Sequence, residues 1–346
     1  MTTRFPAEWE PQSALQLSWP HSQTDCARNL SAVEDSLFAL AAEAGRRQDL
    51  LINCSDALQL PRIRHCLVAA QVPAEHLHLA SMPTNDIWVR DHGPISVRQS
   101  DHWQLLDFEF NGWGGKYPAE LDNRLTARLH AGGVFATTPL AHPQLELEGG
   151  NLETDGAGTL LANRHSLLHH SRNPGRAPGW VESELKKWLG IERILWLDVP
   201  DLEGDDTDGH IDVLARFAGS ETIVFAACSD PGHPDYTKLE LLHSQLLGLR
   251  GRDGRPYRLV PLEVAPPMSG ALGQAMPLSY VNYVLVNGAV LCPGYANATA
   301  DRAAMRALQG CFPERQVVMV PALPLVEHGG SLHCATMQLY SPLSTT

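Results

Sequence analysis

The stretch DDTDGHIDVLARF, residues 205–217, decides the fold because it joins an acidic turn to a run in which polar and apolar residues alternate. Side chains i and i+2 of a strand face the same side. The pattern therefore predicts a strand over 210–217 that projects His210 and Asp212 together and turns Ile211 into the core. Four further segments of this kind, apolar but interrupted by polar residues, lie at 89–97, 145–153, 280–286 and 327–338.

These segments belong to a longer cycle of elements. Leucines at helical spacing predict helices that end near Gly45, Gly190 and Gly248. Short apolar runs predict buried strands at 50–53, 133–138, 193–199, 257–264 and 315–322. The cycle strand, strand, helix, strand favours a radial repeat of ββαβ units, although α/β chains also reach such spacings by chance.

The polar residues that mark the cycle recur at comparable distances. Their separations are 57, 62, 72 and 52 residues, for the markers Asp91, Glu148, His210, Asn282 and Cys334. A closed radial array directs equivalent strands at one centre, so these side chains would gather in one funnel. Such an array makes 346 residues one domain, where length alone suggests two or three.

Composition narrows the classes of function. With 26 Lys and Arg against 39 Asp and Glu, the net charge is −13, which disfavours a nucleic-acid or anionic-membrane binder and is compatible with a cationic ligand. The seven cysteines are scattered without a CxxC pair, so a disulfide framework and a zinc ribbon are disfavoured. Because no secretory h-region and no run of 18 apolar residues is present, we expect a cytoplasmic location.

Two groups of residues suggest chemistry. Cys334 follows two glycines and His333, and a cysteine with a distant histidine is a nucleophile/base pattern, although a lone cysteine is more often a small buried hydrophobe. His210 and Asp212 follow three acidic residues, which is an unusual strand start unless a cation binds. A zinc or iron ion is one such cation. The further histidines do not have metal-motif spacing, so no metal site is predicted; they are His165, His169, His170, His328 and His333.

Motifs across the chain resemble the agmatine deiminase family, which is related to bacterial peptidyl-arginine deiminases in the guanidino-group-modifying superfamily. The resemblance covers about residues 5–340 and is carried by PAEWEPQSALQLSWPH, NDIWVRDHGPISV, FNGWGGKY, LEGGNLETDG, DTDGHIDV, YVNYVLVNGAVLCPGY and GGSLHCATMQ. It implies a five-bladed α/β propeller of ββαβ units, a pentein-type fold in which residues 1–346 form a single catalytic domain. It implies no cofactor, and because members are often dimers or larger it leaves a homodimer open.

Carried over residue by residue, the resemblance implies roles for the marker positions. It matches the nucleophile to Cys334, the general acid/base to His210, the acid that orients the histidine to Glu148, the guanidinium-binding carboxylates to Asp91 and Asp212, and a site asparagine, expected to bind substrate, to Asn282. A guanidinium is a planar cation that pairs bidentately with carboxylates, which leaves its central carbon open to a thiolate. The implied reaction is hydrolytic deimination of agmatine to N-carbamoylputrescine and ammonia through a thiouronium on the cysteine, in polyamine biosynthesis toward putrescine or in nitrogen salvage.

The substrate tail is less constrained. Acids beside the catalytic segment, Glu203, Asp205 and above all Asp206, favour an amine, whereas Arg164 and Arg172 would suit the carboxylate of arginine. Trp88 and Trp113 are expected to flank the aliphatic linker or the cation, with ordinary core packing as the alternative. His328 and Met337 depart from the family's nucleophile segment, which leaves arginine, peptidyl-arginine or another guanidino compound as alternative substrates.

Overall fold

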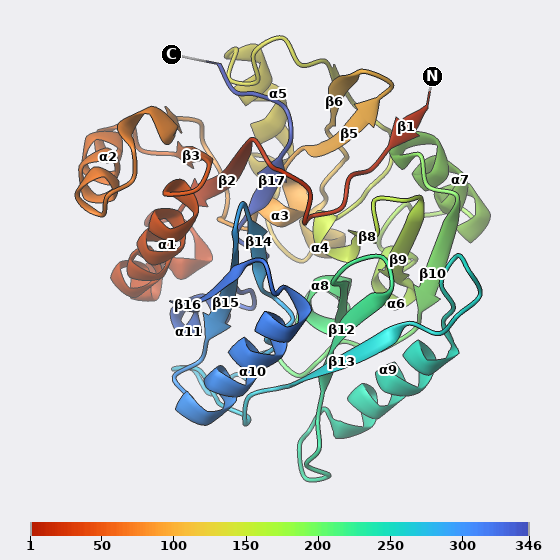
Figure 1. The fold of residues 1–346 in the computed structure, drawn as a ribbon. Coiled ribbons are helices and arrows are strands. Elements are labelled where there is room, and N and C mark those ends of the chain that lie inside the picture. The colour runs from red at the N-terminus through yellow and green to blue at the C-terminus, as the bar shows by residue number, and fades with distance from the viewer. Residues whose placement is uncertain (1, 345–346) are drawn as a thin grey trace.

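The computed structural model describes residues 2–344 and has a mixed α/β fold with several sheets. Five sheets follow one another around the centre of the molecule, and the longer helices lie on the outside (Figure 1). In the order in which the strands pair, the sheets are β1 (Thr3–Arg4), β5 (Ile95–Gln99), β6 (His102–Leu106), β7 (Leu140–Ala141); β8 (Glu153–Thr154), β9 (Thr159–Asn163), β10 (Arg193–Leu197); β11 (Ala215–Phe217), β12 (Thr222–Ala227), β13 (Arg258–Glu263); β14 (Val284–Val286), β15 (Ala289–Gly294), β16 (Gln316–Pro321); and β17 (Met337–Leu339), β2 (Ala14–Trp19), β3 (Asp49–Cys54), β4 (Leu77–Ala80).

Each sheet contains the same core motif. An antiparallel pair is followed by a parallel pair, as in β11–β12 and β12–β13 or β14–β15 and β15–β16. The parallel partners are joined through an outer helix, because parallel strands need a crossover connection. These crossover helices are α1 (Leu30–Gly45), α5 (Leu125–Ala131), α7 (Pro178–Leu189), α9 (Tyr236–Gly248) and α10 (Ala298–Cys311), while α2 (Leu60–Ala69) packs beside α1. The predicted cycle of strand, strand, helix and strand is therefore present.

Most of the predicted regular elements are confirmed. The helices expected to end near Gly45, Gly190 and Gly248 are α1, α7 and α9. Apolar runs at 50–53, 193–199, 257–264 and 315–322 are strands β3, β10, β13 and β16. The strand expected at 133–138 is wrong: this segment is a succession of turns in which Gly133 and Ala136 have positive φ angles of 78° and 50°.

In the polar segments, the sequence periodicity predicts strands where the structure has turns. The predicted strand over 210–217 is wrong, because His210 precedes the helical turn α8 (Ile211–Leu214) and the strand begins only at Ala215. The segment at 89–97 likewise begins as the turn α3 (Val89–His92), and 145–153 contains a 3-10 turn at Gly149–Asn151. Further short helices are α4 (Gly112–Gly115), α6 (Arg164–Leu167) and α11 (Leu323–Val326). Each polar segment therefore turns at the centre before its strand begins.

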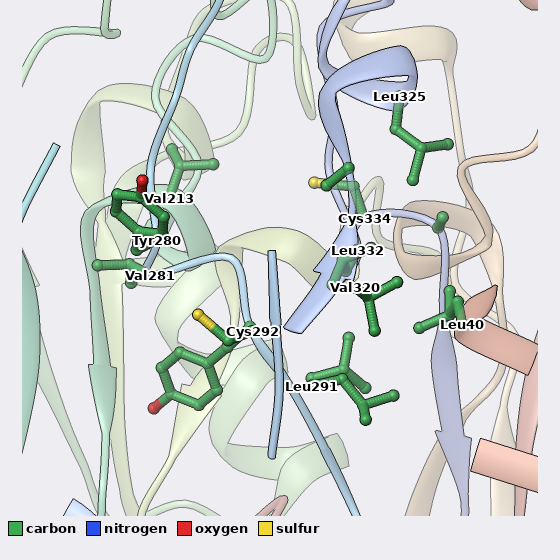
Figure 2. Packing of buried hydrophobic residues seen from close by; sticks show 14 of the residues in the cluster. Leu40, Val213, Tyr280, Val281, Leu291, Cys292, Val320, Leu325, Leu332 and Cys334 are labelled. Atoms are coloured by element: carbon green, nitrogen blue, oxygen red, sulfur yellow. The ribbon is translucent and has the colours of Figure 1, made fainter. Parts of the chain in front are cut away.

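The largest apolar cluster surrounds the end of the chain that carries Cys334. Leu291 of β15, Val320 of β16 and Leu332 lie in succession beneath Cys334 (Figure 2). Leu291 and Leu332 have no exposed surface. The turn that carries Cys334 thus rests on a close-packed floor, which limits its movement. No helix within residues 2–344 has the length and apolar character needed to cross a bilayer.

We predict that Leu291→Ala lowers the free energy of unfolding by about 2–5 kcal/mol, because it removes a fully buried side chain and leaves a cavity under the Cys334 turn. Urea denaturation followed by circular dichroism measures this. Leu272→Ala is the matched control: Leu272 is 71% exposed, so its replacement should change stability by no more than about 0.5 kcal/mol. Equal effects of the two substitutions would contradict this account of the core.

Candidate active site

The thiol of Cys334 lies in a turn that directly precedes β17. Asn282 Nδ2 is 3.2 Å from Sγ, and Asn282 Oδ1 accepts hydrogen bonds from the peptide nitrogens of His333 (2.9 Å) and Cys334 (3.4 Å). Asn282 Nδ2 also lies 3.3 Å from the carbonyl oxygen of Asp212. One buried amide therefore connects the cysteine turn to the segment that carries Asp212.

Asp212 lies between the thiol and a second histidine. Its Oδ2 is 3.7 Å from Cys334 Sγ and 2.8 Å from His333 Nδ1. Its Oδ1 has no hydrogen-bond partner among the described residues, although Asp212 is only 1% exposed. A buried carboxylate oxygen without a partner is costly, so this atom is available to a donor from a ligand.

His210 lies among the remaining predicted groups. Its Nδ1 is 3.6 Å from Asp91 Oδ1, and its Nε2 is 3.9 Å from Glu148 Oε2. Neither ring nitrogen has a hydrogen-bond partner within residues 2–344. Gly150 is required at this point: its peptide nitrogen donates to Asp91 Oδ1 at 2.9 Å, and a Cβ on it would lie 2.5 Å from His210 Nδ1. The absence of a side chain at residue 150 lets the histidine and the aspartate approach.

Glu148 is fixed from behind by a residue that the sequence did not assign to it. Arg172 Nε lies 3.0 and 3.2 Å from the two oxygens of Glu148, and the same guanidinium pairs with Asp208 and donates to the carbonyl of Thr207. The alternative in which Arg172 binds a substrate carboxylate is therefore wrong, because its donors are already used inside the protein. Arg164 stacks 5.4 Å over the ring of Trp196.

Burial and charge shift the pKa values of these groups in opposite directions. Burial alone would lower the pKa of His210, but Asp91, Glu148 and Asp212 outweigh burial and raise it to about 9. Burial raises the pKa of Asp91 to about 6 against the opposing effect of His210. Burial, together with Asp212 and Asp91, raises the pKa of the Cys334 thiol well above its usual range. The unliganded site therefore favours a neutral thiol beside a protonated His210.

A pocket leads from Cys334 and Asp91 to the surface. It is lined by Asp25, Asp86, Trp88, Asp91, Trp113, Tyr117, Asp206, Thr207, His328, Gly329, Gly330 and Cys334. The predicted site residues Trp88, Trp113 and Asp206 are thus in its wall, while His210, Asp212, Glu148 and Asn282 are buried behind its inner end. Five chain segments distant in sequence meet here.

The two tryptophans are held by specific contacts. Trp113 Nε1 donates to Asp91 Oδ2 at 3.0 Å, and Trp113 has a positive φ of 53° in the segment Gly112–Gly115. A bulky residue in this conformation is strained, and strain is retained where the surroundings enforce it. Trp88 packs on Gly330, where a Cβ would lie 2.4 Å from the indole ring. Both indoles line the pocket, and the prediction that they flank the ligand stays a prediction.

The outer part of the pocket contains acids that sequence reasoning missed. These acids are Asp86, in a segment without regular structure, and Asp25. Asp206 Oδ2 accepts a hydrogen bond from Tyr117 at 2.5 Å, and His328 Nδ1 lies 3.5 Å from Asp25 Oδ2.

Of the other two predicted tail acids, neither lines the pocket. Asp205 accepts hydrogen bonds from Thr207 through Oδ1, and Glu203 is exposed and lies 3.8 Å from Lys238 Nζ. The acids of the pocket come from segments far apart in the sequence, so no single motif could indicate that they lie together. Across residues 2–344, no three His, Cys, Asp or Glu side chains have an arrangement that would hold a metal ion.

The chain is similar to known deiminases in sequence and in fold. The sequence pattern of the Porphyromonas-type peptidyl-arginine deiminases matches residues 4–339. A Porphyromonas gingivalis structure named as a candidate arginine deiminase is 41% identical, with a TM-score of 0.90 and coverage of 99% of both chains. A substrate-bound cysteine-to-serine variant of the C. jejuni agmatine deiminase is 27% identical, with a TM-score of 0.89 and coverage of 99% of this chain and 97% of the other. A candidate agmatine deiminase of Vibrio parahaemolyticus is 30% identical over 97% of this chain and 96% of its own length.

These findings define the protein as an enzyme that acts on carbon–nitrogen bonds, with an α/β fold consistent with pentein-type deiminases. The chain belongs to the Porphyromonas-type peptidyl-arginine deiminase family. The family resemblance that the motifs indicated is confirmed.

We predict that alkylation of Cys334 by neutral iodoacetamide accelerates with pH without levelling off below about pH 9, because the buried thiol ionises above its usual pKa of about 8.5. Peptide mass spectrometry follows this cysteine separately from the other six. Asp212→Asn removes a negative charge next to Sγ and should shift the curve to lower pH. Asp205→Asn, also buried but not in contact with the thiol, is the control, and a wild-type plateau below pH 8 would contradict the prediction.

Proposed function

We propose that the protein hydrolyses agmatine to N-carbamoylputrescine and ammonia. The observation that carries this proposal is the polarity of the pocket. Its inner end presents the Cys334 thiol and Asp91, its outer part presents Asp25, Asp86 and Asp206, and no Lys or Arg belongs to its lining among the described residues. A molecule with a guanidinium at one end and an ammonium at the other matches both ends.

In the proposed binding mode, Asp91 and Asp212 hold the guanidinium. The unpartnered Oδ1 of Asp212 supports this assignment, since it is a buried acceptor without a donor. Asp91 is oriented by Gly150 and Trp113, which each donate one hydrogen bond to it. Two fixed carboxylates set the plane of the cation and leave its central carbon facing Cys334 Sγ.

The proposed chemistry has two halves. As the cation binds, the thiol releases its proton to water at the mouth of the pocket, and the thiolate attacks the guanidinium carbon to form a tetrahedral adduct. His210, protonated at neutral pH, transfers its proton to the departing nitrogen; ammonia leaves and an S-alkylthiouronium remains on Cys334. Neutral His210 then takes a proton from water, and the hydroxide attacks the same carbon. As the carbon–sulfur bond breaks, the hydroxyl proton of the adduct passes to the departing sulfur, which frees the ureido product and restores the thiol and the protonated His210.

Glu148 and Asn282 have supporting roles in this proposal. Glu148 stabilises the imidazolium of His210 from 3.9 Å, and Arg172 keeps that carboxylate ionised and fixed, so the pKa of Glu148 is lowered in spite of burial. Asn282, expected to bind substrate, lies instead against the nucleophile, and we assign it to positioning Sγ. Substrate-assisted ionisation of the thiol follows from the raised pKa of Cys334, because the arriving cation offsets the neighbouring carboxylates.

Arginine or a peptidyl-arginine is the second candidate substrate. The relative from Porphyromonas gingivalis, at 41% identity, is named for arginine, whereas the agmatine-named relatives reported above are 27–30% identical. A substrate carboxylate would, however, lie near Asp25, Asp86 and Asp206 without a cation from Lys or Arg in the described lining. Like charges at this distance are unfavourable, so agmatine is preferred.

We further propose that the five sheets are the blades of a pseudo-symmetric α/β propeller that forms one catalytic domain. The repeated antiparallel–parallel strand order and the ring of sheets in Figure 1 support it. A cytoplasmic location remains the expectation from the scattered, unpaired cysteines.

We predict that the enzyme releases ammonia from agmatine and that Cys334→Ala abolishes this release, because the nucleophile is removed. Ammonia release from agmatine, arginine, a peptidyl-arginine and further guanidino compounds, scored as kcat/KM, measures the preference. Agmatine should exceed arginine by more than about 10-fold, equivalent to about 1.4 kcal/mol. An arginine preference of that size would overturn the choice of substrate, and full activity of the alanine variant would overturn the mechanism.

We predict that Asp86→Asn together with Asp206→Asn raises the KM for agmatine about 10-fold or more and changes kcat little, because these acids contact the tail and not the reacting carbon. Glu203→Gln is the matched control, since Glu203 is nearby and acidic but does not line the pocket. Steady-state ammonia release gives both constants. A loss confined to kcat, or an equal effect of the control, would remove the tail assignment.

A further inference from the structure

His333 is buried beside the nucleophile but has no role in the reaction proposed above. Its Nδ1 lies 2.8 Å from Asp212 Oδ2 and its Nε2 lies 3.0 Å from Glu8 Oε2. Its side chain is 2% exposed, and its peptide nitrogen donates to Asn282 Oδ1. Both ends of the ring and its backbone are therefore fixed.

The far partner of His333 is itself held firmly. Glu8 forms an ion pair with Arg216 and accepts a hydrogen bond from the peptide nitrogen of Leu285 at 2.9 Å. Arg216 also pairs with Glu153 and stacks 4.4 Å over the ring of Tyr283. Burial would raise the pKa of Glu8, but Arg216 and His333 hold it below its usual range, so Glu8 remains a carboxylate. The histidine is anchored to an ionised group that does not itself reach the pocket.

The two nitrogen–oxygen contacts require two hydrogens. A carboxylate accepts but does not donate, and a neutral imidazole has one N–H. Asp212, His333 and Glu8 therefore hold two protons among the three groups. The charged groups facing the ring are Asp212 from α8, Glu8 from the N-terminal segment, Arg216 from β11 and Arg90 from α3. Because the pKa values of Glu8 and Asp212 are both lowered, the two hydrogens lie on the ring, although burial and the two arginines lower the pKa of His333.

We propose that His333 is a positioning residue for guanidinium binding. By joining Asp212 Oδ2 to Glu8, it fixes the carboxylate and leaves Oδ1 as the oxygen that meets the substrate. This inference rests on the proposed function, because it assigns Asp212 to the guanidinium. It explains why Oδ1 has no partner within the described residues while Oδ2 has one.

The proposal also predicts the ionisation of Asp212. Burial would raise the pKa of this carboxyl, but the hydrogen bond and charge of His333 outweigh burial and lower it. Without the His333 ring, the effect of burial on Asp212 is offset less, so the pKa of Asp212 must rise. A raised pKa means that Asp212 becomes protonated, and loses its hold on a cation, at a higher pH than in the native protein.

The test compares labelling of Cys334 by a cationic haloacetamidine with labelling by neutral iodoacetamide between pH 5 and 9. The amidinium must occupy the carboxylates to react, whereas iodoacetamide needs only the thiol. In His333→Leu, we expect the amidine-to-iodoacetamide rate ratio to fall about 10-fold, and its decline in acid to move upward by about one pH unit. A merely structural role would alter both reagents alike and leave the ratio and its pH dependence unchanged.

Two conservative variants test the two ring nitrogens of His333 separately. An asparagine amide takes the place of Nδ1, and a glutamine amide takes the place of Nε2. His333→Asn should therefore restore much of the ratio by donating to Asp212, whereas His333→Gln, which donates toward Glu8, should not. This comparison still decides the question if His333→Leu does not fold, because the two variants have the same polarity. Equal ratios for the asparagine and glutamine variants would overturn the proposal.

Glu153→Gln is the matched control for the buried network. Glu153 contacts Arg216 but does not contact His333, so the ratio should stay at its wild-type value even if stability falls. The proposed function is tested separately by ammonia release from agmatine in the wild-type enzyme. If agmatine is not a substrate while the amidine ratio behaves as expected, the positioning role of His333 stands and the proposed substrate is wrong. If agmatine is a substrate while the ratio does not change, only the positioning role of His333 is wrong.

Discussion

Asp91, Glu148 and Asp212 bring three carboxylates into a region with almost no solvent, and each negative charge there needs a donor or a cation to remain ionised. The compensation is divided among separate partners. Arg172 forms an ion pair with Glu148, and His333 contacts Asp212 through Nδ1. The peptide nitrogen of Gly150 and the indole of Trp113 donate hydrogen bonds to Asp91. His210 lies near all three acids, which keeps its proton in place. Net negative charge remains at the centre, and a guanidinium is the kind of ligand that neutralises it.

The chain can make this arrangement only after its two ends have met. β17 pairs antiparallel with β2, so the last strand completes a sheet whose other members come from the first 80 residues. Cys334 lies three residues before β17, and Glu8 lies six residues before β2. The same pairing therefore brings Cys334 and His333 to Asp212 and places Glu8 on the far side of His333. Closure of the ring of sheets and assembly of the site are one structural event.

The sequence predicted the repeated topology and most of the residues now at the centre, because buried strands and amphipathic helices have strong periodicity. The strand predictions are wrong where the backbone turns. His210 and Asp212 do not share the face of a strand; they lie at the start of a helical turn, and their neighbours across the site position them. The contacts of Arg172 and His333 could not be predicted, since their partners lie 24 and 121 residues away in the sequence. Contacts of that kind depend on how the sheets close, which local pattern does not encode.

The acids at the two ends of the pocket differ in their burial and in their internal partners, and this difference affects how a substrate would be selected. At the inner end, every acid has an internal partner and is almost fully buried, so its geometry is fixed before a ligand arrives. At the outer end, Asp86 has a pKa raised by burial to about 7, and Asp25 is exposed, with His328 Nδ1 3.5 Å from its carboxylate. An ammonium that reaches Asp86 favours its ionised form, so recognition of the tail includes the work of ionising a carboxyl. A neutral or anionic tail gains nothing from that step. In the proposed function, the reaction therefore depends on the rigid inner end, whereas selection among guanidino compounds depends on a carboxylate charge that the ligand itself helps to create.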